Sequence, residues 1–473
     1  MKLTTKDLSS IRHIEFRNKE LLKGRRITGV STDSRITQPG DLFVALRGDR
    51  FDGHNFINEA IAKQAAAAVV EKTATLSMHA ALPLLVVEDT MHALGELAHL
   101  HRMKFDIPVI AVAGSNGKTT TKEMIARVLM SAYRVLSTEG NLNNQIGVPL
   151  TLLRLQKRHE IAIVEIGTNH PGEIAYLCEI VHPTHGMITN IGREHLEFFH
   201  SLDGVATEQG ALFDTLKAAK NAEAFVNAND EYVVRLARGI RNVTTYGFGA
   251  KRSGVRGKLL GADASGCPRF QFATKKMSRG IPVQLAVPGT HHALNGLAAA
   301  AVGVAFGVAP TKIRKALERF HPASRRMELV EIAGVTVYND SYNANPDSMI
   351  AALRTLAAVN VPGKKIAVLG DMLELGRYAE EEHARVGKEV TTLDLDYLLT
   401  YGEMSRHAQR EAKIQYAIHY DQKNVLAEYL AELIAPGDAV LIKGSRGMKM
   451  EDIVTFLQER FHAPAVSVGS MRR

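Results

Sequence analysis

The sequence contains no tryptophan, only two cysteines and no long apolar run. Cys178 and Cys267 stand far apart and without CxxC spacing, which argues against a disulfide framework and predicts two reduced thiols. No apolar run approaches the ~20 residues that a membrane-spanning helix needs. The N-terminus, MKLTTKDLSSIRHIEF, lacks the apolar segment of a secretory signal. We therefore expect a cytoplasmic protein without stable membrane insertion.

The charge pattern argues against a nucleic-acid-binding protein. The chain has 58 Lys and Arg against 50 Asp and Glu, which gives a net charge of +8. Such a charge attracts anionic ligands such as nucleotides, and the alternative explanation is a solvated basic surface. The basic residues are scattered, with short clusters such as 23–26 and 251–252. Because the sequence has no basic arm, zinc finger or aromatic–basic ladder, we expect no nucleic-acid partner.

The length of the chain, 473 residues, suits about three domains. We place them at residues 1–100, 101–319 and 320–473. The second and third blocks alternate apolar strands with helical stretches, which is typical of a parallel sheet covered by helices. The predicted fold class is therefore α/β. It comprises a smaller N-terminal α/β domain, a central domain with a P-loop-type parallel sheet, and a doubly wound C-terminal domain.

Local patterns give further predictions for each block. In the N-terminal block, strands are predicted at 41–46 and 84–87, and an alanine-rich helix at about 58–68. In the central block, the polar, glycine-rich piece 247–280 is predicted to be a hairpin or a flexible excursion. The strands predicted for the C-terminal block are 335–339, 365–369, 397–400 and 439–442.

The most informative single motif is a glycine-rich turn between an apolar strand, 109–113, and a helix predicted at 119–133. Glycines allow a tight turn, backbone N–H groups point at an anion, and the helix N-terminus adds partial positive charge. Lys118 can reach terminal phosphates, and the Thr119 hydroxyl can bind the accompanying Mg²⁺. Val112 stands where GxxxxGK[ST] has its first glycine, yet the context favours phosphate binding over a plain turn. The loop comprises Gly114, Ser115, Asn116, Gly117, Lys118, Thr119 and Thr120.

Other polar residues follow predicted strands of the central sheet, where ligands of open α/β sheets bind. Glu165 closes the strand 161–166, and its position favours a Mg²⁺ ligand over a capping or salt-bridged carboxylate. His195 follows the strand 186–189 and, taken alone, is better explained as a structural histidine. The asparagine-rich loop 141–147 is either a turn or a source of amides for a polar substrate.

Two more polar clusters follow strands of the C-terminal block, at 339–346 and 443–447. Each can alternatively be explained as the capped start of a helix, with Asp347 and Ser348 as a second pair of capping candidates. Two such clusters on a domain that faces a phosphate-binding domain make a shared cleft plausible. Such a cleft could close on its ligands.

Six motifs, in order, resemble the Mur ligase family: GSNGKTTTKEM, NLNNQIGVP, VEIGTNHPGEI, DSYNANPDSM, LGDMLELG and KGSRGMKME. The run from STDSR to PGDLFVALRGDRFDGHNFI is similar to the uridine-nucleotide domain of its later-acting members. Within the family, NANPDSM and KGSR resemble the members that add D-alanyl-D-alanine to a UDP-N-acetylmuramoyl-tripeptide. The Asp-Asn-Pro-Arg motif of the members that add the third amino acid is absent from the sequence. The resemblance spans nearly the whole chain.

The resemblance implies an ATP-dependent amide ligase of peptidoglycan synthesis. In this family a peptide carboxylate attacks the γ-phosphorus of ATP to give an acyl phosphate, and the incoming amine then attacks the acyl group. The implied cofactors are ATP and Mg²⁺, and the implied substrates are UDP-N-acetylmuramoyl-tripeptide and D-alanyl-D-alanine. Cations and hydrogen-bond donors must balance the charge on the transferring phosphoryl group. We expect the protein to be a monomer.

The resemblance also assigns roles to individual residues. Residues 114–120 would hold the phosphates, and the predicted metal ligands are Thr119, Glu165, His195 and Gln209. The adenosine and cleft closure would involve Asn295, Arg326 and Asp340. The dipeptide and the acyl phosphate would be placed by Tyr342, Asn343, Asn345, Lys443, Ser445 and Arg446. The uridine diphosphate would meet Ser31, Asp33, Ser34, Arg35, Asp52 and His54, and the muramoyl peptide would contact Asn141 and Asn144. The predicted catalytic residues are Lys118, Asn141, His195, Lys443 and Arg446.

Gln209 departs from the family pattern. Many members carry a carbamylated lysine that supports a second Mg²⁺, and Gln209 aligns with it. A glutamine offers one neutral carbonyl oxygen and cannot be carbamylated. Either Gln209, helped by Glu208, replaces that ligand, or the second ion is held more weakly, or the alignment is shifted by a residue or two. No lysine is nearer in sequence than Lys217, which lies about two helical turns away.

Two classes of function stay open from the sequence. The leading one is the ligase, whose near rivals are related ligases that act on other muramoyl peptides or on folate. The uridine-type N-terminal domain argues against a folate substrate. The alternative class is a noncatalytic nucleotide-binding relative that binds a partner, which only Gln209 supports. The residues that argue against it are Lys118, Glu165, His195 and Asp340.

Overall fold

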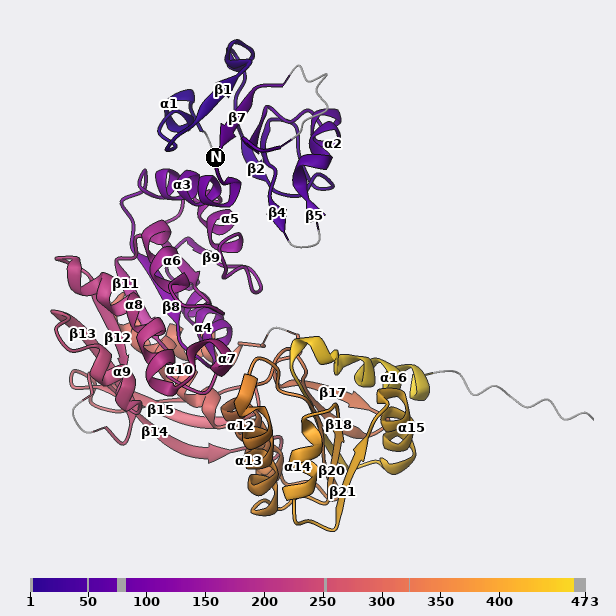
Figure 1. The fold of residues 1–473 in the computed structure, drawn as a ribbon. Helices are drawn as coiled ribbons and strands as arrows, with labels where there is room; N and C mark the ends of the chain where they lie inside the picture. The colour runs from indigo at the N-terminus through magenta and orange to yellow at the C-terminus, as the bar shows by residue number, and fades with distance from the viewer. Residues whose placement is uncertain (1–2, 49–50, 75–81, 251–252, 323, 463–473) are drawn as a thin grey trace, which may run out of the picture.

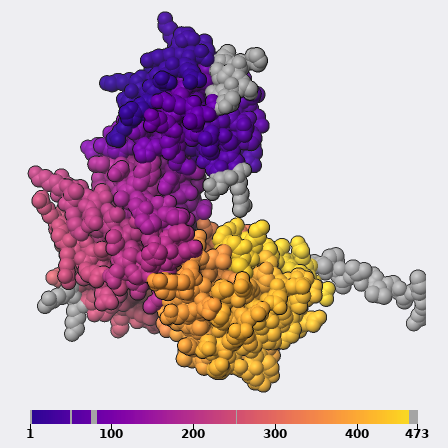
Figure 2. Space-filling model, viewed as in Figure 1, coloured from indigo at the N-terminus to yellow at the C-terminus, as the bar shows by residue number. Residues whose placement is uncertain are grey.

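The computed structural model describes residues 3–48, 51–74, 82–250, 253–322 and 324–462. Three large β-sheets, each with its own helices, follow one another along the described chain (Figure 1). The central domain contacts both of the others (Figure 2). The predicted fold class, α/β with three domains, is confirmed. No helix in the described part of the chain is long and apolar enough to cross a bilayer.

The N-terminal domain is built on a five-stranded sheet with the order β1-β7-β6-β3-β2. Its strands are parallel except β1, which pairs antiparallel with β7. The strands are β1 (Glu15–Arg17), β2 (Gly29–Ser31), β3 (Asp41–Val44), β6 (Ala67–Glu71) and β7 (Leu84–Val87), and β4 (Arg47–Gly48) and β5 (Phe51–Asp52) form a separate pair. The helices are α1 (Thr5–Leu8), α2 (Ile57–Ala62) and α3 (Thr90–Arg102), with short 3₁₀ turns at Lys19–Leu22 and Gly53–Phe56.

One local prediction for this domain is wrong. The alanine-rich stretch 58–68 was expected to be a single helix, but α2 ends at Ala62 and the chain then enters β6, an inner strand of the sheet. Gln64, with a φ of 61°, turns the backbone between them. Alanine is common in helices, so the composition pointed to a helix, whereas burial of residues 67–70 between two neighbouring strands decides the structure.

The central domain carries a nine-stranded sheet with the order β16-β15-β14-β13-β12-β11-β8-β10-β9. It is parallel from β9 to β14, and β15 and β16 add antiparallel to its far edge. The strands are β8 (Val109–Ala113), β9 (Val135–Ser137), β10 (Ile161–Glu165), β11 (His185–Ile188), β12 (Glu223–Asn227), β13 (Asn242–Phe248), β14 (Val255–Ala262), β15 (Pro268–Thr274) and β16 (Ile281–Gln284). The helices are α4 (Lys118–Met130), α5 (Gly147–Leu153), α6 (Glu173–Val181), α7 (Leu196–Phe199), α8 (Leu202–Ala218), α9 (Glu231–Leu236), α10 (His291–Ala305) and α11 (Pro310–Glu318).

Strand β8 shows why this sheet is covered on both faces. All five of its residues are buried, as expected of an inner parallel strand. Because successive side chains point to opposite faces, Ile110 and Val112 join the core formed with α4 and α10. Val109, Ala111 and Ala113 join the core formed with α6 and α8. Strands β9 and β10 lie on one side of β8, and β11 and β12 lie on the other. The strand order therefore reverses direction at β8, and ligands of such sheets bind beyond the carboxyl ends of the strands at this point.

The segment 247–280 is largely part of the central sheet. It contains β14, β15 and the end of β13, of which β14 and β15 form the hairpin that was one of the two predictions. The other, a flexible excursion, is wrong for the described residues. Phe270 and Phe272 of β15 are fully buried and pack with α10. Buried aromatic side chains therefore attach this polar segment to the domain.

The C-terminal domain has a six-stranded sheet with the order β17-β18-β22-β19-β20-β21, parallel except for β17. Strand β22 is inserted between β18 and β19, so the carboxyl ends of β18 and β22 lie side by side. The strands are β17 (Glu328–Ile332), β18 (Val335–Asp340), β19 (Lys365–Gly370), β20 (Tyr397–Tyr401), β21 (Tyr416–Tyr420) and β22 (Ala439–Lys443). The helices are α12 (Pro346–Ala358), α13 (Ala379–Thr391), α14 (Ser405–Glu411), α15 (Lys423–Leu433) and α16 (Glu451–His462), with 3₁₀ turns at Gly376–Tyr378 and Arg446–Met448.

The three sheets lie within residues 15–87, 109–284 and 328–443. Helix α3 crosses the predicted boundary at residue 100, and it packs against α5 and α6 of the central domain as well as against β6. Because α3 packs against both domains, the boundary at 100 stays a prediction, and the boundary at 319 stays a prediction as well.

Candidate active site

A cavity of about 910 Å³ lies between the central and C-terminal domains. It is lined by the turns that follow β8, β10 and β11 on one side and those that follow β18 and β22 on the other. Many residues singled out in the sequence line it, namely Ser115, Asn116, Gly117, Lys118, Thr119, Thr120, Asn141, Asn144, Glu165, His195, Asn295, Arg326, Asp340, Tyr342, Asn343, Asn345, Lys443, Ser445 and Arg446. Gly114, Gln209 and the six N-terminal candidates do not line it.

The turn between β8 and α4, taken with the first residues of the helix as residues 114–120, is called the phosphate loop below after its predicted role, and its glycines permit its shape. Gly114 and Gly117 have φ values of 113° and 76°, which side chains with a Cβ rarely adopt. A Cβ on Gly117 would lie 2.9 Å from Asn295 Oδ1, so α10 approaches the loop closely. Gly192 N donates to Ser115 Oγ at 2.9 Å, which ties the loop to the turn after β11. The loop is thereby held at the N-terminus of α4, the end of a helix that attracts anions.

Lys118 is folded back over this loop. Its Nζ donates to the carbonyl oxygens of Gly114 and Ser115, at 2.5 and 3.3 Å, and lies 3.4 Å from Glu194 Oε2. Two backbone carbonyls and a carboxylate are the hydrogen-bond partners of this ammonium group. Phosphate oxygens can replace these partners when a nucleotide binds. The geometry suits a lysine that moves onto a nucleotide.

Glu165 has the features of a magnesium ligand. The side chain is buried, and Oε1 accepts hydrogen bonds from Thr119 Oγ1 at 3.0 Å and from Asn143 Nδ2 at 2.9 Å. Its other oxygen, Oε2, is buried without a hydrogen-bond partner. Because leaving a buried carboxylate oxygen unpaired is costly, this atom fits the place of a cation.

The protein groups alone do not make a metal cage. Among the described residues, no group of three or more His, Cys, Asp or Glu side chains is arranged to hold an ion. Magnesium usually binds through one or two carboxylates and the phosphates of a nucleotide, and it keeps several waters. The donor set of Thr119 and Glu165 beside a phosphate loop therefore fits Mg²⁺ that arrives with ATP.

The loop 138–146, which follows β9, is anchored beside the cavity. Lys122, almost fully buried, donates from Nζ to Thr138 O at 2.8 Å, and Glu165 N donates to Thr138 Oγ1 at 3.0 Å. Asn144 Oδ1 accepts a hydrogen bond at 2.9 Å from the first backbone N–H of α5. Its amide therefore has a capping role, while Asn141 of the same loop lines the cavity.

His195 meets the C-terminal domain directly. Its Nδ1 lies 2.5 Å from Glu374 Oε2, and contact with the imidazole is the main cause that lowers the pKa of Glu374. Both residues have left-handed backbones, with φ values of 48° and 62°. Non-glycine residues in this region carry strain that tends to mark functional sites. Nearby, Tyr378 OH donates to His200 O at 2.8 Å, so the two domains touch at more than one point.

Gln209 is fully buried, and both the oxygen and the nitrogen of its side-chain amide are hydrogen-bonded. Gly114 N donates to Gln209 Oε1 at 2.8 Å, and Gln209 Nε2 donates to Glu194 Oε1 at 2.8 Å. Glu208 turns away from the cavity and accepts hydrogen bonds from the backbone at Gly172 and Ile174, at the start of α6. Gln209 therefore links the phosphate loop to Glu194 through its amide. Glu208 caps the N-terminus of α6.

The C-terminal side of the cavity centres on a buried ion pair. Lys443 Nζ lies 2.6 Å from Asp340 Oδ2 and also donates to Asn343 O at 2.9 Å. Asp340 and Lys443 are register neighbours at the ends of β18 and β22, so the sheet itself brings them together. Ser445 Oγ donates to Ala344 O at 3.2 Å. These bonds hold the turn after β18 against the turn after β22.

Arg326, Tyr342 and Asn295 form a different part of the wall. The Arg326 guanidinium stacks on the Tyr342 ring, 3.9 Å from its centroid. Asn295 Nδ2 lies 3.2 Å from His292 Nδ1. Burial, together with nearby His291 and Arg326, holds the pKa of His292 well below its ordinary value, so its imidazole is neutral at pH 7. A flat cation and neutral donors and acceptors are suited to a heterocyclic base.

Charged and polar residues connect the central domain to α12 and α13. Asn345 Nδ2 donates to Asn116 Oδ1 at 2.9 Å, which joins the phosphate loop to the start of α12. Arg193 N donates to Asp347 Oδ2 at 2.7 Å, and Arg193 Nε lies 3.2 Å from Glu382 Oε1. The turn after β11 therefore contacts both the phosphate loop and the C-terminal domain.

The six N-terminal candidates make bonds within their own domain. Ser31 Oγ lies 2.7 Å from Thr37 Oγ1, and Ser34 Oγ donates to Glu59 Oε2 at 2.7 Å. Exposed Arg35 forms an ion pair with Asp33 at 2.7 Å. The remaining two, Asp52 and His54, pair at 2.5 Å. Their roles in binding a uridine nucleotide stay predictions.

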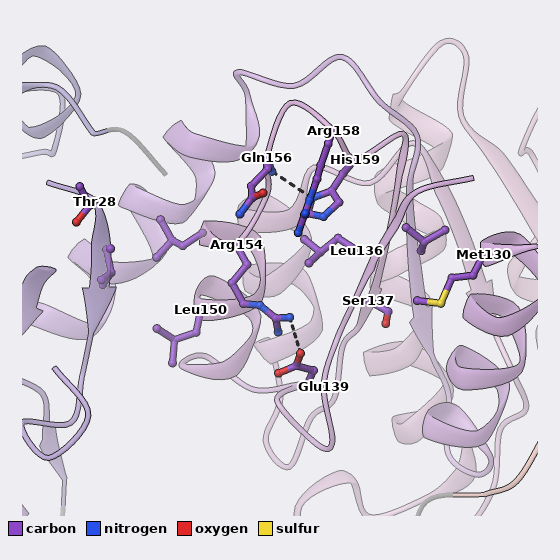
Figure 3. Close-up of a pocket in the computed structure, with 14 residues that line it drawn as sticks. Thr28, Met130, Leu136, Ser137, Glu139, Leu150, Arg154, Gln156, Arg158 and His159 are labelled. Atoms are coloured by element: carbon purple, nitrogen blue, oxygen red, sulfur yellow. Dashed lines mark hydrogen bonds and ion pairs between the residues drawn. The ribbon is translucent and has the colours of Figure 1, made fainter. Parts of the chain in front are cut away.

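A separate cavity of about 480 Å³ lies between the N-terminal and central domains. Figure 3 shows Thr28 on one wall and, facing it, Arg154 paired with Glu139. The cavity lies between β2 and β9, the edge strands of the two sheets. It shares no lining residue with the larger cavity. Because the phosphate loop lines only the larger cavity, that cavity is the candidate active site.

Sequence reasoning missed four residues of the site: Asn143, Arg193, Glu194 and Glu374. Asn143 and Glu374 stand inside motifs that were recognised, but nothing distinguished them from their neighbours. Glu194 had a usable signal, because an acid directly precedes a histidine assigned to the metal. What the sequence could not show is that Glu194 is buried and lies beside Lys118.

The fold and the site define a three-domain α/β protein in which a glycine-rich loop at a helix N-terminus faces a polar cluster of a doubly wound C-terminal domain. Family models agree with this class along most of the chain. The model described as Mur ligase family, catalytic domain, matches residues 26–102. The Mur ligase middle domain matches residues 112–303, and the Mur ligase, glutamate ligase domain, matches residues 325–446. The chain belongs to the Mur ligase family.

Individual relatives make the family assignment more specific. The UDP-N-acetylmuramoyl-tripeptide–D-alanyl-D-alanine ligase of Escherichia coli is 37% identical over 93% of this chain and 96% of its own length. The ligase of the same name from Bacillus subtilis is 36% identical over 92% and 93%. Among solved structures, MurF from Acinetobacter baumannii matches with a TM-score of 0.88 at 32% identity, covering 97% of this chain and 99% of that one. MurF ligase from Thermotoga maritima in complex with ADP matches with a TM-score of 0.81 at 28% identity, over 93% and 99%.

Proposed function

We propose that this chain is an ATP-dependent ligase that joins D-alanyl-D-alanine to UDP-N-acetylmuramoyl-tripeptide and so makes the pentapeptide precursor of peptidoglycan. The relatives that carry this name match the chain over nearly its full length. The structural observation that carries the proposal is the shared cavity, in which the phosphate loop faces the ion pair of Asp340 and Lys443. The cytoplasmic location and the monomeric state stay predictions.

The first chemical step would be activation of the tripeptide. Its terminal carboxylate attacks the γ-phosphorus of ATP, the bond to the β-phosphate oxygen breaks, and ADP leaves an acyl phosphate behind. Negative charge spreads over the transferring group, and Lys118 and the N-terminus of α4 would stabilise it. Thr119 and Glu165 would hold Mg²⁺, which supplies further charge neutralisation when bound.

The second step would be attack by the dipeptide amine on the acyl carbon. The amine gives up one proton, which leaves with the phosphate, and the tetrahedral intermediate collapses by breaking the bond between the acyl carbon and the phosphate oxygen, so an amide bond is formed. Lys443 is held toward the cavity by Asp340 and Asn343 O, and Arg446 is half exposed and paired at 2.8 Å with Glu451. Both cations are suited to a dipeptide carboxylate and to the departing phosphate. Asn343, in the turn after β18, would add a neutral donor and acceptor to the cavity wall.

The noncatalytic alternative rested on Gln209. In the structure this residue is bonded to the phosphate loop and to Glu194, so it is an ordered part of the site. Lys118, Glu165 and His195 all line the shared cavity, which supports a catalytic site over a noncatalytic one. The ligase is therefore the function that the geometry supports best.

Product formation tests the proposal. We expect phosphate release from ATP and Mg²⁺ to require both the UDP-tripeptide and D-alanyl-D-alanine, and mass spectrometry to show one pentapeptide for each phosphate. Tripeptides with lysine and with diaminopimelate as third residue should both be supplied. ATP binding without release, or release that continues without the dipeptide, would argue for a different function.

A further inference from the structure

Glu194 is a buried carboxylate at the wall of the nucleotide cavity that no part of the proposed chemistry has yet used. Its side chain is about 5% exposed, and the residue lines the cavity. One oxygen, Oε1, accepts the hydrogen bond from Gln209 Nε2. The other, Oε2, lies 3.4 Å from Lys118 Nζ and 3.9 Å from His195 Nε2. Two residues already assigned to the phosphates and to the metal therefore surround this second oxygen.

The position of Glu194 is fixed by its neighbours. Gln209 is fully buried on α8 and spans from Gly114 N to Glu194 Oε1 through two bonds of 2.8 Å. Gln209 Oε1 is therefore directed at the phosphate loop and not at the cavity. The amide group of Gln209 places a carboxylate at the wall and leaves Glu194 Oε2 facing Lys118 and His195.

The surroundings of Oε2 are those of a cation site. Glu194 Oε2 and His195 Nε2 lie 3.9 Å apart, so a small movement of either side chain would let both atoms contact one divalent cation. Lys118 already places a positive charge beside this oxygen. The same cavity also contains Glu165 Oε2, a carboxylate oxygen that is buried without a hydrogen-bond partner.

We propose that Glu194 is a metal ligand, which together with His195 binds a divalent cation at the phosphate end of the nucleotide, and that Gln209 positions it. The proposal rests on the proposed function in needing a nucleotide that carries a cation into the cavity. In this arrangement the negatively charged oxygen that binds the cation belongs to Glu194. Gln209 only orients Glu194, which a neutral amide can do. Glu208, which caps α6, plays no part in it.

Binding of Mn²⁺ tests this inference without relying on turnover. Electron paramagnetic resonance measures free and bound Mn²⁺ in the presence of the ATP analogue with an imido β–γ bridge. We expect Glu194→Gln to weaken Mn²⁺ binding in this complex at least tenfold, and Gln209→Leu to weaken it about tenfold by releasing the carboxylate. Glu197→Gln is the matched control, because Glu197 is an exposed acid of the same segment, and it should stay within twofold of the unchanged protein.

The results separate the inference from its competitors. Mn²⁺ affinity that is unchanged in Glu194→Gln would overturn it. If Glu194 served only to hold Lys118, the variant would change the affinity for nucleotide in EDTA and leave Mn²⁺ binding intact, which would overturn it as well. Should Glu194→Gln fold poorly, Glu194→Asp keeps the charge on a shorter side chain and is expected to bind Mn²⁺ more weakly than the unchanged protein. Ligase activity of the unchanged protein, measured in parallel, reports separately on the proposed function.

Discussion

Replacing Lys118 with alanine is expected to lower kcat about 100- to 1,000-fold. The ammonium group lies over the phosphate loop, bonded only to two carbonyls and to Glu194, so it is free to move onto the transferring phosphoryl group. Removing one such stabilising group from a transition state typically costs about 3–4 kcal/mol, which corresponds to that loss. Steady-state phosphate release with both substrates at saturation measures the effect.

The matched control is Lys157→Ala, which removes an exposed lysine of the same domain. It should leave kcat within twofold. A Lys118→Ala variant that unfolds at the same temperature as the unchanged protein and keeps kcat within tenfold would contradict the role assigned to Lys118.

Replacing Lys443 with methionine is expected to affect both stability and activity. Lys443 is about 3% exposed and pairs with Asp340 across β18 and β22, so its removal leaves a carboxylate with little solvent around it. Breaking a buried pair on one side costs about 3 kcal/mol or more, which should lower the melting temperature of the C-terminal domain by roughly 6–12 °C. Activity should fall at temperatures where the domain remains folded, because Lys443 also lines the cavity.

Differential scanning calorimetry and phosphate release together measure this effect. Lys388→Met is the control, since Lys388 is an exposed lysine of α13 in the same domain. A Lys443→Met protein that melts with the control and turns over at the normal rate would show that the pair is dispensable. If Lys443→Met lowers the melting temperature but keeps full activity, Lys443 has the structural role and not the catalytic one.

The sequence was sufficient for the fold class because the patterns were long and repeated. Strands such as β8, β10 and β22 are runs of buried apolar residues after which the chain turns into a loop or helix, and inner parallel strands are built this way. The alanine-rich stretch before β6 failed because alanine fits both helices and buried strands. Only the neighbouring strands β3 and β7 select between the two states.

The candidate site was predictable where several of its polar residues stand next to one another in a single turn. The phosphate loop and the ends of β18 and β22 each contain several polar residues in sequence, and sheet register then places Asp340 beside Lys443. The contact of Glu194 with Gln209 joins residues 15 positions apart, on a turn and a helix, and no local pattern encodes it. The same is true of His195 and Glu374, which come from different domains.

The roles of the N-terminal residues could not be derived in this way. Ser31 and Asp33 were assigned through resemblance, and in the structure they bond within their own domain. Their link to the active site depends on a substrate long enough to span from one domain to the other. Neither the sequence pattern nor the arrangement of side chains supplies that link without the substrate.

The central claim is that ATP activates the tripeptide carboxylate before the amide bond forms. The most direct test uses UDP-tripeptide whose terminal carboxylate is labelled with ¹⁸O, together with D-alanyl-D-alanine, ATP and Mg²⁺. Because the carboxylate oxygen that attacks the γ-phosphorus leaves with the phosphate, we predict one ¹⁸O atom in each phosphate released. Phosphate that carries no label, although pentapeptide is formed, would contradict the acyl phosphate and with it this account of the site.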